Sequence, residues 1–196
     1  MSRGVLAIAL IGAACWSASA AELTAIPSKE NRTIVVLNGE LAVGDASRFK
    51  EIVKASASAG RPVSALRLNS PGGSLIEGVR LAAVIHGTKI ATVVGAGATC
   101  AGACFIPFVG GSQKFVSTTA TVSVPGAASD LQPTGKTPAV VRVETPSIVR
   151  VVKAMGLLDA IVTRMLATSE GDAFQLSVDD LRAMGATMTG KPTQLR

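Results

Sequence analysis

The segment from Leu66 to Ser74 constrains the fold of this chain more than any other. Its first residues predict a buried strand, which ends in the tight turn Pro71-Gly72-Gly73. Ser74 and Glu77 then form the S-x-x-E pattern of a helix N-terminus. Such a turn leaves backbone N–H groups free of side chains, as an oxyanion hole requires. On the turn alone, an ordinary strand-to-helix connection is the simpler interpretation, because glycine-rich turns are common.

The rest of the sequence also alternates strands and helices, which is typical of an α/β layered fold. A helix is expected to begin at a capping Asp45, and a short one to end at Phe108. Further strands are predicted at 34–37, 63–68, 89–94 and within 114–124, and further helices at 74–86, 147–155, 157–166 and 177–184. The segment 125–146 contains four prolines, which predicts a long loop or a segment that orders on binding.

Residues 1–20 have the three parts of a secretory signal peptide. These are Arg3, an apolar run from Val5 to Trp16, and the small residues at 18–20. Cleavage after Ala20 is expected, which predicts a periplasmic or secreted protein. An uncleaved anchor is disfavoured, because a run of about a dozen residues is shorter than the roughly 20 that span a bilayer. The mature protein is therefore not expected to be an integral membrane protein.

The composition favours one folded domain. The chain has 196 residues, of which 48% are hydrophobic and 16% charged. We expect a linker at 21–30, a single domain at 31–188 and a polar tail at 189–196. The net charge of +6 is scattered, and only five phenylalanines remain as aromatic side chains after cleavage, which disfavours nucleic-acid binding. With one histidine and two cysteines left, no metal site is expected.

Several segments resemble the ClpP peptidase family in order and spacing, and together they cover about residues 31 to 188. Within the wider ClpP/crotonase group, the chain is most similar to exported bacterial proteins with a C-A-S-A-C motif. The resemblance implies a ClpP/crotonase-like α/β fold, a spiral of repeated β-β-α units in one domain. The matching segments are 31–41, 69–73, 95–111 with the motif Cys100-Ala101-Gly102-Ala103-Cys104, 168–177 and 183–185.

The resemblance also assigns site positions. A family serine attacks a carbonyl, a histidine takes its proton and an acid orients the histidine. Here the serine position is Gly102, the histidine position is about Pro125 and the acid is Asp172. Glycine and proline can supply neither nucleophile nor base. The oxyanion donors would be the backbone N–H groups of Gly73 and Ala103, which need no particular side chain.

Cys100 and Cys104 flank the vacant nucleophile position. We predict that they form a disulfide, because the expected compartment is oxidising and no histidine is at hand to activate a thiol. On a helical turn their Cα atoms would be about 6 Å apart, which a disulfide allows. The bridge would contribute roughly 2 kcal/mol and would stiffen the turn that carries Ala103.

The resulting hypothesis is a binding or scaffold protein for a peptide or protein ligand, without a cofactor. The apolar stripe of the helix 147–155 predicts a homo-oligomer, a trimer or a hexamer-like ring, with a monomer as the alternative. His86 is assigned to the last turn of a helix and not to catalysis. A crotonase-type acyl-CoA reaction is disfavoured by export.

The rival hypothesis is a serine-type peptidase or another hydrolase whose nucleophile stands elsewhere. A hydroxyl nucleophile needs a base, and only a lysine could replace the missing histidine. The candidate nucleophiles are Ser70, Thr99, Ser117 and Ser123, and the candidate lysines are Lys114, Lys136 and Lys153.

Overall fold

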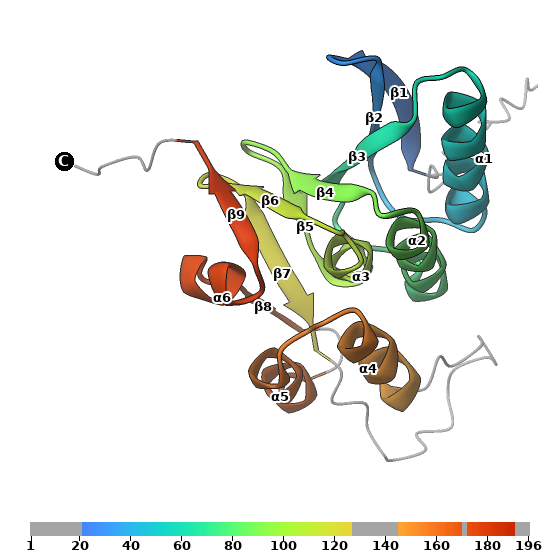
Figure 1. Cartoon of the computed structure of the whole chain (residues 1–196). Coiled ribbons are helices and arrows are strands. Elements are labelled where there is room, and N and C mark those ends of the chain that lie inside the picture. Colours follow the sequence, from blue (N-terminus) through green and yellow to red (C-terminus); the bar gives the residue numbers. More distant parts are fainter. Residues whose placement is uncertain (1–20, 127–144, 170–171, 191–196) are drawn as a thin grey trace, which may run out of the picture.

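The computed structural model describes residues 21–126, 145–169 and 172–190. In these ranges the chain is α/β, with two sheets and helices at their sides (Figure 1). The larger sheet has the order β1 (Glu22–Ser28), β2 (Arg32–Asn38), β3 (Val63–Asn69), β4 (Ala91–Val94), β6 (Lys114–Ser117) and β9 (Ala186–Thr189). The smaller sheet has the order β5 (Thr99–Cys100), β7 (Thr121–Pro125) and β8 (Ala173–Gln175).

The helices connect these strands. They are α1 (Asp45–Ser58), α2 (Leu75–Thr88), the short 3-10 helix η1 (Gly102–Cys104), α3 (Phe105–Val109), α4 (Thr145–Ala154), α5 (Asp159–Ala167) and α6 (Val178–Ala183). No helix within the described ranges is long and apolar enough to cross a membrane.

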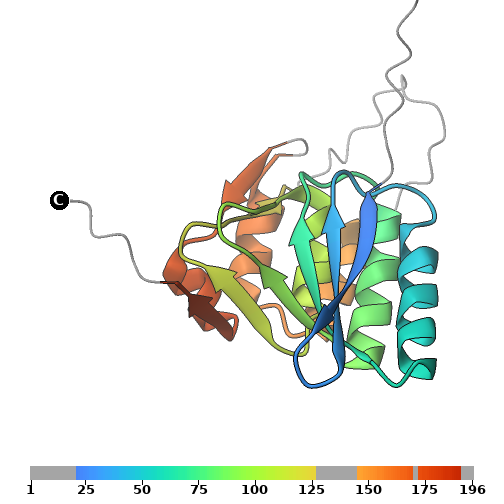
Figure 2. The same cartoon turned by 90° about the horizontal axis from the view of Figure 1, so that it is seen from above.

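The core lies between the larger sheet and its helices. Alternate residues of the parallel strands, such as Leu37, Leu66 and Val94, are fully buried on one face, as period-two patterning requires. Helices α1 and α2 run along that face and contribute Phe49 and Leu81 to the same cluster (Figure 2). Helix α3 packs against α2, β4 and β7 and so joins the two sheets.

The predicted linker at 21–30 is wrong. Residues 22–28 form strand β1, which pairs antiparallel with all of β2. The sequence gives a weak strand signal there, because Pro27 interrupts it, yet proline is tolerated on an edge strand. The domain therefore begins before residue 31. The predicted signal peptide at 1–20 lies outside the described residues and stays a prediction.

Two other differences concern short strands. The strand region predicted within 114–124 consists of β6 and β7, which belong to different sheets. Strands β5, β8 and β9 have two to four residues each and were not predicted, since so few residues show no period. Thr189, the first residue of the predicted tail, still belongs to β9, and 191–196 lie outside the described residues. The spiral of β-β-α units stays a prediction.

Two glycines of helix α2 give a matched test of its packing. A methyl group on Gly78 would stand 2.7 Å from the Ala103 carbonyl oxygen, whereas Gly87 has nothing within 4 Å. We predict that Gly78→Ala lowers the free energy of unfolding by about 1–3 kcal/mol through overpacking. Gly87→Ala should raise it by about 0.5 kcal/mol through helix propensity.

Chemical denaturation of both variants and the wild type measures these changes. Equal effects of the two substitutions would contradict the close approach of Ala103 to α2.

Candidate functional site

The site is built where the chain leaving β3 meets the chain leaving β5. Ser70 and Cys100 form an isolated parallel bridge, in which the Ser70 N–H donates to the Thr99 oxygen over 2.7 Å. The Ala101 N–H donates in turn to the Ser70 oxygen over 3.1 Å. The Pro71-Gly72-Gly73 turn and the start of η1 therefore continue side by side.

These two turns touch through glycine backbone. An added Cβ on Gly72 would stand 3.1 Å from both the Ala101 oxygen and the Ala103 nitrogen. One on Gly102 would stand 3.2 Å from the Pro71 oxygen. Gly72 has φ +122° and Gly102 has φ +53°, in the region that favours glycine. Side chains at either position would separate the turns.

Gly73 is fixed from its other side by Leu41. The Leu41 N–H donates to the Gly72 oxygen over 2.7 Å, and the Ser74 N–H donates to the Leu41 oxygen over 2.8 Å. An added Cβ on Gly73 would stand 2.4 Å from the Leu41 oxygen, and φ is +115°. Glycine is therefore required here by both space and backbone angle. No local pattern predicts the role of Leu41, because its partners Gly72 and Ser74 are 31 or more residues away.

Two backbone donors remain at this junction. Among the described residues, the N–H groups of Gly73 and Ala103 have no hydrogen-bond acceptor. Gly73 is exposed, whereas Ala103 is buried at the start of η1. Unpaired N–H groups can donate to a carbonyl or carboxylate oxygen, as in an oxyanion hole. They are the two groups that the family resemblance assigned to that role.

The other assigned positions come together at the end of β7. Strand β5 pairs parallel with β7, with Cys100 opposite Val122, so both strands run toward the same end. Pro125 pairs with Ala173 of β8, and the Gly126 N–H donates to the Asp172 oxygen over 2.9 Å. The Asp172 carboxylate is exposed. Gly102 and Pro125, which stand at the assigned nucleophile and base positions, carry no group that could serve as either.

An arginine holds β8 in place. The Arg164 guanidinium lies 4.2 Å from the centroid of the Phe174 ring and donates to Asp180 Oδ2 over 2.9 Å. Burial acts to raise the pKa of Asp180, but hydrogen bonds from Arg164 and from Ser177 outweigh it and lower the pKa. This contact joins α5, β8 and α6 beside Asp172.

The four alternative nucleophiles are buried or half-buried. Ser70 is buried within the turn, where its hydroxyl accepts from the Gly72 N–H over 3.2 Å. Ser117 is buried and its hydroxyl lies 3.2 Å from that of Thr119. Thr99 and Ser123 are half-buried on β5 and β7. No hydrogen bond joins any of these hydroxyls to a lysine in the described ranges.

The candidate lysines are engaged elsewhere. Lys153 Nζ lies 2.6 Å from Asp159 Oδ1 in an exposed ion pair. Lys114 Nζ donates to the Gly111 oxygen over 3.3 Å, and burial lowers the pKa of this amine. Lys136 lies outside the described residues. His86 is exposed in the last turn of α2, where it was expected.

Cys100 and Cys104 lie at disulfide distance, with 2.08 Å between their sulfur atoms and 5.2 Å between their Cα atoms. Both are fully buried. The bridge spans η1 and so encloses Gly102 and Ala103. The described residues contain no cluster of potential metal ligands.

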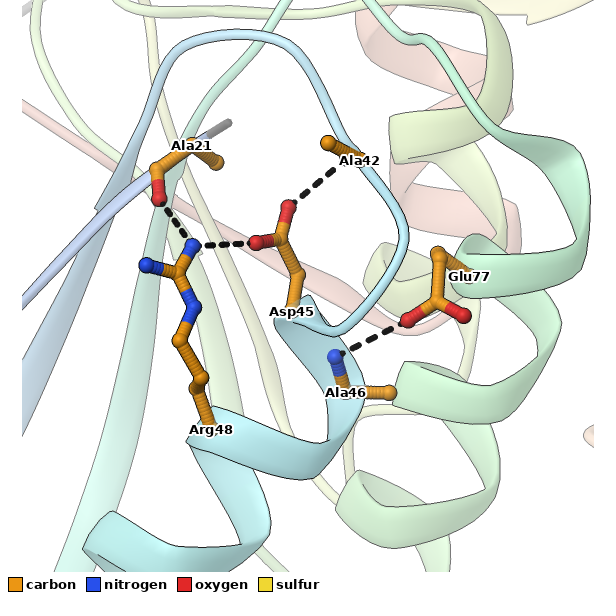
Figure 3. A network of polar contacts seen from close by, with 6 residues as sticks. All are labelled: Ala21, Ala42, Asp45, Ala46, Arg48 and Glu77. Atoms are coloured by element: carbon orange, nitrogen blue, oxygen red, sulfur yellow. Dashed lines mark hydrogen bonds and ion pairs between the residues drawn. The ribbon is translucent and has the colours of Figure 1, made fainter. Parts of the chain in front are cut away.

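The carboxylates of Asp45 and Glu77 accept other N–H groups than their capping patterns predict (Figure 3). The buried Asp45 carboxylate accepts the Ala42 N–H over 2.8 Å and not an N–H of the helix that it was predicted to cap. Ser74 caps α2 as predicted, by accepting the Glu77 N–H over 3.4 Å. The Glu77 carboxylate, however, accepts the Ala46 N–H of α1 over 3.2 Å. Only half of the expected capping box is therefore formed.

No protein-family model matches this sequence, and no curated protein matches it significantly. Among solved structures, the chain is similar to a variant of ClpP1 from Listeria monocytogenes. The TM-score is 0.49 and the sequence identity 16%, over 81% of this chain and 92% of the other. At this similarity, activity, ligand and assembly have to be argued from the residues.

The cysteine pair gives a direct test. We predict that protein exported by the cell and then denatured without reductant has almost no titratable thiol, because Cys100 and Cys104 are joined. The same sample after reduction should show both. Two free thiols in the unreduced sample would contradict the bridge and leave the start of η1 without its cross-link.

Proposed function

We propose that this chain is an exported ClpP-like protein that binds a peptide or protein ligand and does not cleave it. The observation that carries the proposal is the pair of unpaired N–H groups of Gly73 and Ala103, in two turns held together by glycine contacts. Such donors can hold a peptide carbonyl or a carboxylate without any side chain. A peptide offers these oxygens along its whole length.

The chain lacks catalytic side chains at the positions next to these donors. Hydrolysis through a covalent intermediate needs a nucleophile and a base within hydrogen-bond reach of each other. By the sequence resemblance these positions are Gly102 and about Pro125, and neither residue has a suitable group. Asp172 alone would have nothing to orient. An oxyanion hole without a nucleophile remains a binding site.

Export is part of the same proposal. The pattern of residues 1–20 is that of a signal peptide. A cysteine pair at disulfide distance is compatible with an oxidising compartment.

The first test of silence is chemical labelling. We predict that purified protein neither turns over peptide or ester substrates nor reacts with an active-site phosphonate probe, because no activated hydroxyl is in place. Mass spectrometry of the treated protein measures the label. Stoichiometric modification of a Ser or Thr would overturn the proposal in favour of the serine-type hydrolase.

Restoring the nucleophile alone should have little effect. Gly102→Ser places a hydroxyl beside the Pro71 carbonyl at a φ of +53°, which a serine adopts only with strain, and adds no base. We expect no more than a trace of esterase activity. Gly95→Ser is the matched control, because a Cβ added to Gly95 would have nothing within 4 Å. Robust hydrolysis by Gly102→Ser would show that a base exists elsewhere.

The assembly proposed from the sequence is a homo-oligomer with α4 at or near the contact. In the structure Val152 is fully buried and Val149 and Met155 pack against the core, so part of the apolar stripe serves the chain itself. Val151 is half-buried and is the better probe of a contact. The side chain of Ile148 lies outside the described residues.

We predict that the wild type sediments as an oligomer at micromolar concentration and that Val151→Asp dissociates it into single chains, which keep the wild-type secondary structure by circular dichroism. Ala154→Asp, at an exposed and uncharged position of α4, controls for the added negative charge. A wild type that sediments at the mass of one chain would contradict this assembly.

A further inference from the structure

We propose that Glu77 is the positioning residue of the ligand site. By holding the start of α1, its carboxylate fixes Leu41, and through Leu41 the N–H of Gly73. This role rests on the proposed function, in which the Gly73 N–H donates to the ligand. Within the described ranges, no hydrogen bond joins Glu77 to the Gly73 or Ala103 N–H.

Helix α2 forms only half of a capping box. In a complete capping box, the third helical residue accepts the N–H of the N-cap residue. Helix α6 has this arrangement, in which the Asp180 carboxylate accepts the Ser177 N–H over 3.0 Å. In α2 the Ser74 N–H instead donates to the Leu41 oxygen. The Glu77 carboxylate is thereby free to bind another partner.

That partner is the first turn of a different helix. Glu77 is 1% exposed, and its Oε2 accepts the Ala46 N–H over 3.2 Å (Figure 3). Its Oε1 accepts from Arg80 over 2.8 Å. Ala46 is the second residue of α1. A carboxylate at a helix N-terminus satisfies a free N–H and complements the helix dipole. Here one carboxylate does so for α1 from its place in the first turn of α2.

The first turn of α1 then fixes the loop that carries Leu41. Asp45, which is fully buried, accepts the Ala42 N–H over 2.8 Å, and its own N–H donates to the Ala42 oxygen over 3.2 Å. Arg48 binds the same carboxylate and the Ala21 oxygen, which ties β1 to this point. Leu41 precedes Ala42 and bonds to both sides of Gly73.

The contacts form a closed ring. It runs from Glu77 to Ala46, through Asp45 and Ala42 to Leu41, and from Leu41 to Ser74, whose hydroxyl accepts the Glu77 N–H. Gly73 lies within the ring, between Leu41 and Ser74. If the Ala46 contact is lost, a buried N–H has no acceptor and the loop of Leu41 loses its anchor. The Gly73 turn would then move without any change at the turn itself.

The ligand-free protein tests this role through two amides. The N–H groups of Leu41 and Ser74 both bond across the Gly73 turn, so their hydrogen exchange reports its integrity. In protein made from the full sequence, we expect Glu77→Met to speed both exchanges by at least about tenfold. Glu77→Asp, whose shorter carboxylate cannot reach Ala46, should do the same and serves if the first variant does not fold.

Three control variants show whether faster exchange comes from loss of the Glu77–Ala46 hydrogen bond. Glu77→Gln keeps an oxygen acceptor and should stay close to the wild type in both exchange rates. Arg80→Gln removes only the exposed partner of Glu77 and should leave them unchanged. Leu181→Ala, in the buried face of α6, supplies a comparable loss of global stability far from the ring. The proposal is overturned if Leu41 and Ser74 exchange no faster in the Glu77→Met and Glu77→Asp variants than in Leu181→Ala.

A failure of the proposed binding function would appear in a peptide titration and not in the exchange rates of Leu41 and Ser74. If a mixture of N-acetylated random hexapeptides leaves the amide signals of Gly73 and Ala103 of the wild type unmoved, the binding function falls. The exchange data on Leu41 and Ser74 would still decide whether Glu77 positions the turn, because they need no ligand.

Discussion

The closeness of two glycine turns is the constraint on which the candidate site depends. Gly72 lies against the turn that begins η1, and Gly73 lies against Leu41 so closely that no Cβ fits. Only glycine satisfies both the space and the positive φ angles. The hydrogen bonds around Leu41 and Ser70 then fix the two turns at one place. The contacts between the two turns themselves are therefore contacts between backbone atoms.

A binding site made of backbone N–H donors does not depend on particular catalytic side chains. The N–H groups of Gly73 and Ala103 depend on the path of the chain, whereas a nucleophile and a base depend on particular residues. In this chain the path is supported from two directions. The Cys100 and Cys104 pair spans η1 on one side, and the buried carboxylates of Asp45 and Glu77 secure the Leu41 loop on the other. This separation is what makes a binding role without cleavage physically reasonable.

The local features of the fold could be predicted from the sequence. The strand before Pro71, the Ser74 cap and the helix to about His86 each follow from neighbouring residues. The proximity of Cys100 and Cys104 followed from their helical spacing. Asp172 was assigned through the family resemblance, and its chain does lie beside Pro125 and Gly126.

Features that depend on distant partners could not be predicted. Glu77 was identified as a capping residue, but its carboxylate binds Ala46, which is 31 positions away. Strand β1 contains a proline and gains its stability from pairing with β2, so its own residues gave little signal. The contact of Leu41 with Gly73 arises only once β2 and β3 are side by side. Such contacts are properties of the assembled sheet and not of any one segment.

The most direct measurement of the central claim is a titration of the labelled wild type with N-acetylated random hexapeptides, followed by proton–nitrogen correlation NMR. We expect the Gly73 and Ala103 amide signals to move together and to saturate. In the same samples the peptides should remain intact. Cleaved peptide would contradict the absence of a nucleophile, and unmoved Gly73 and Ala103 signals would contradict the binding site itself.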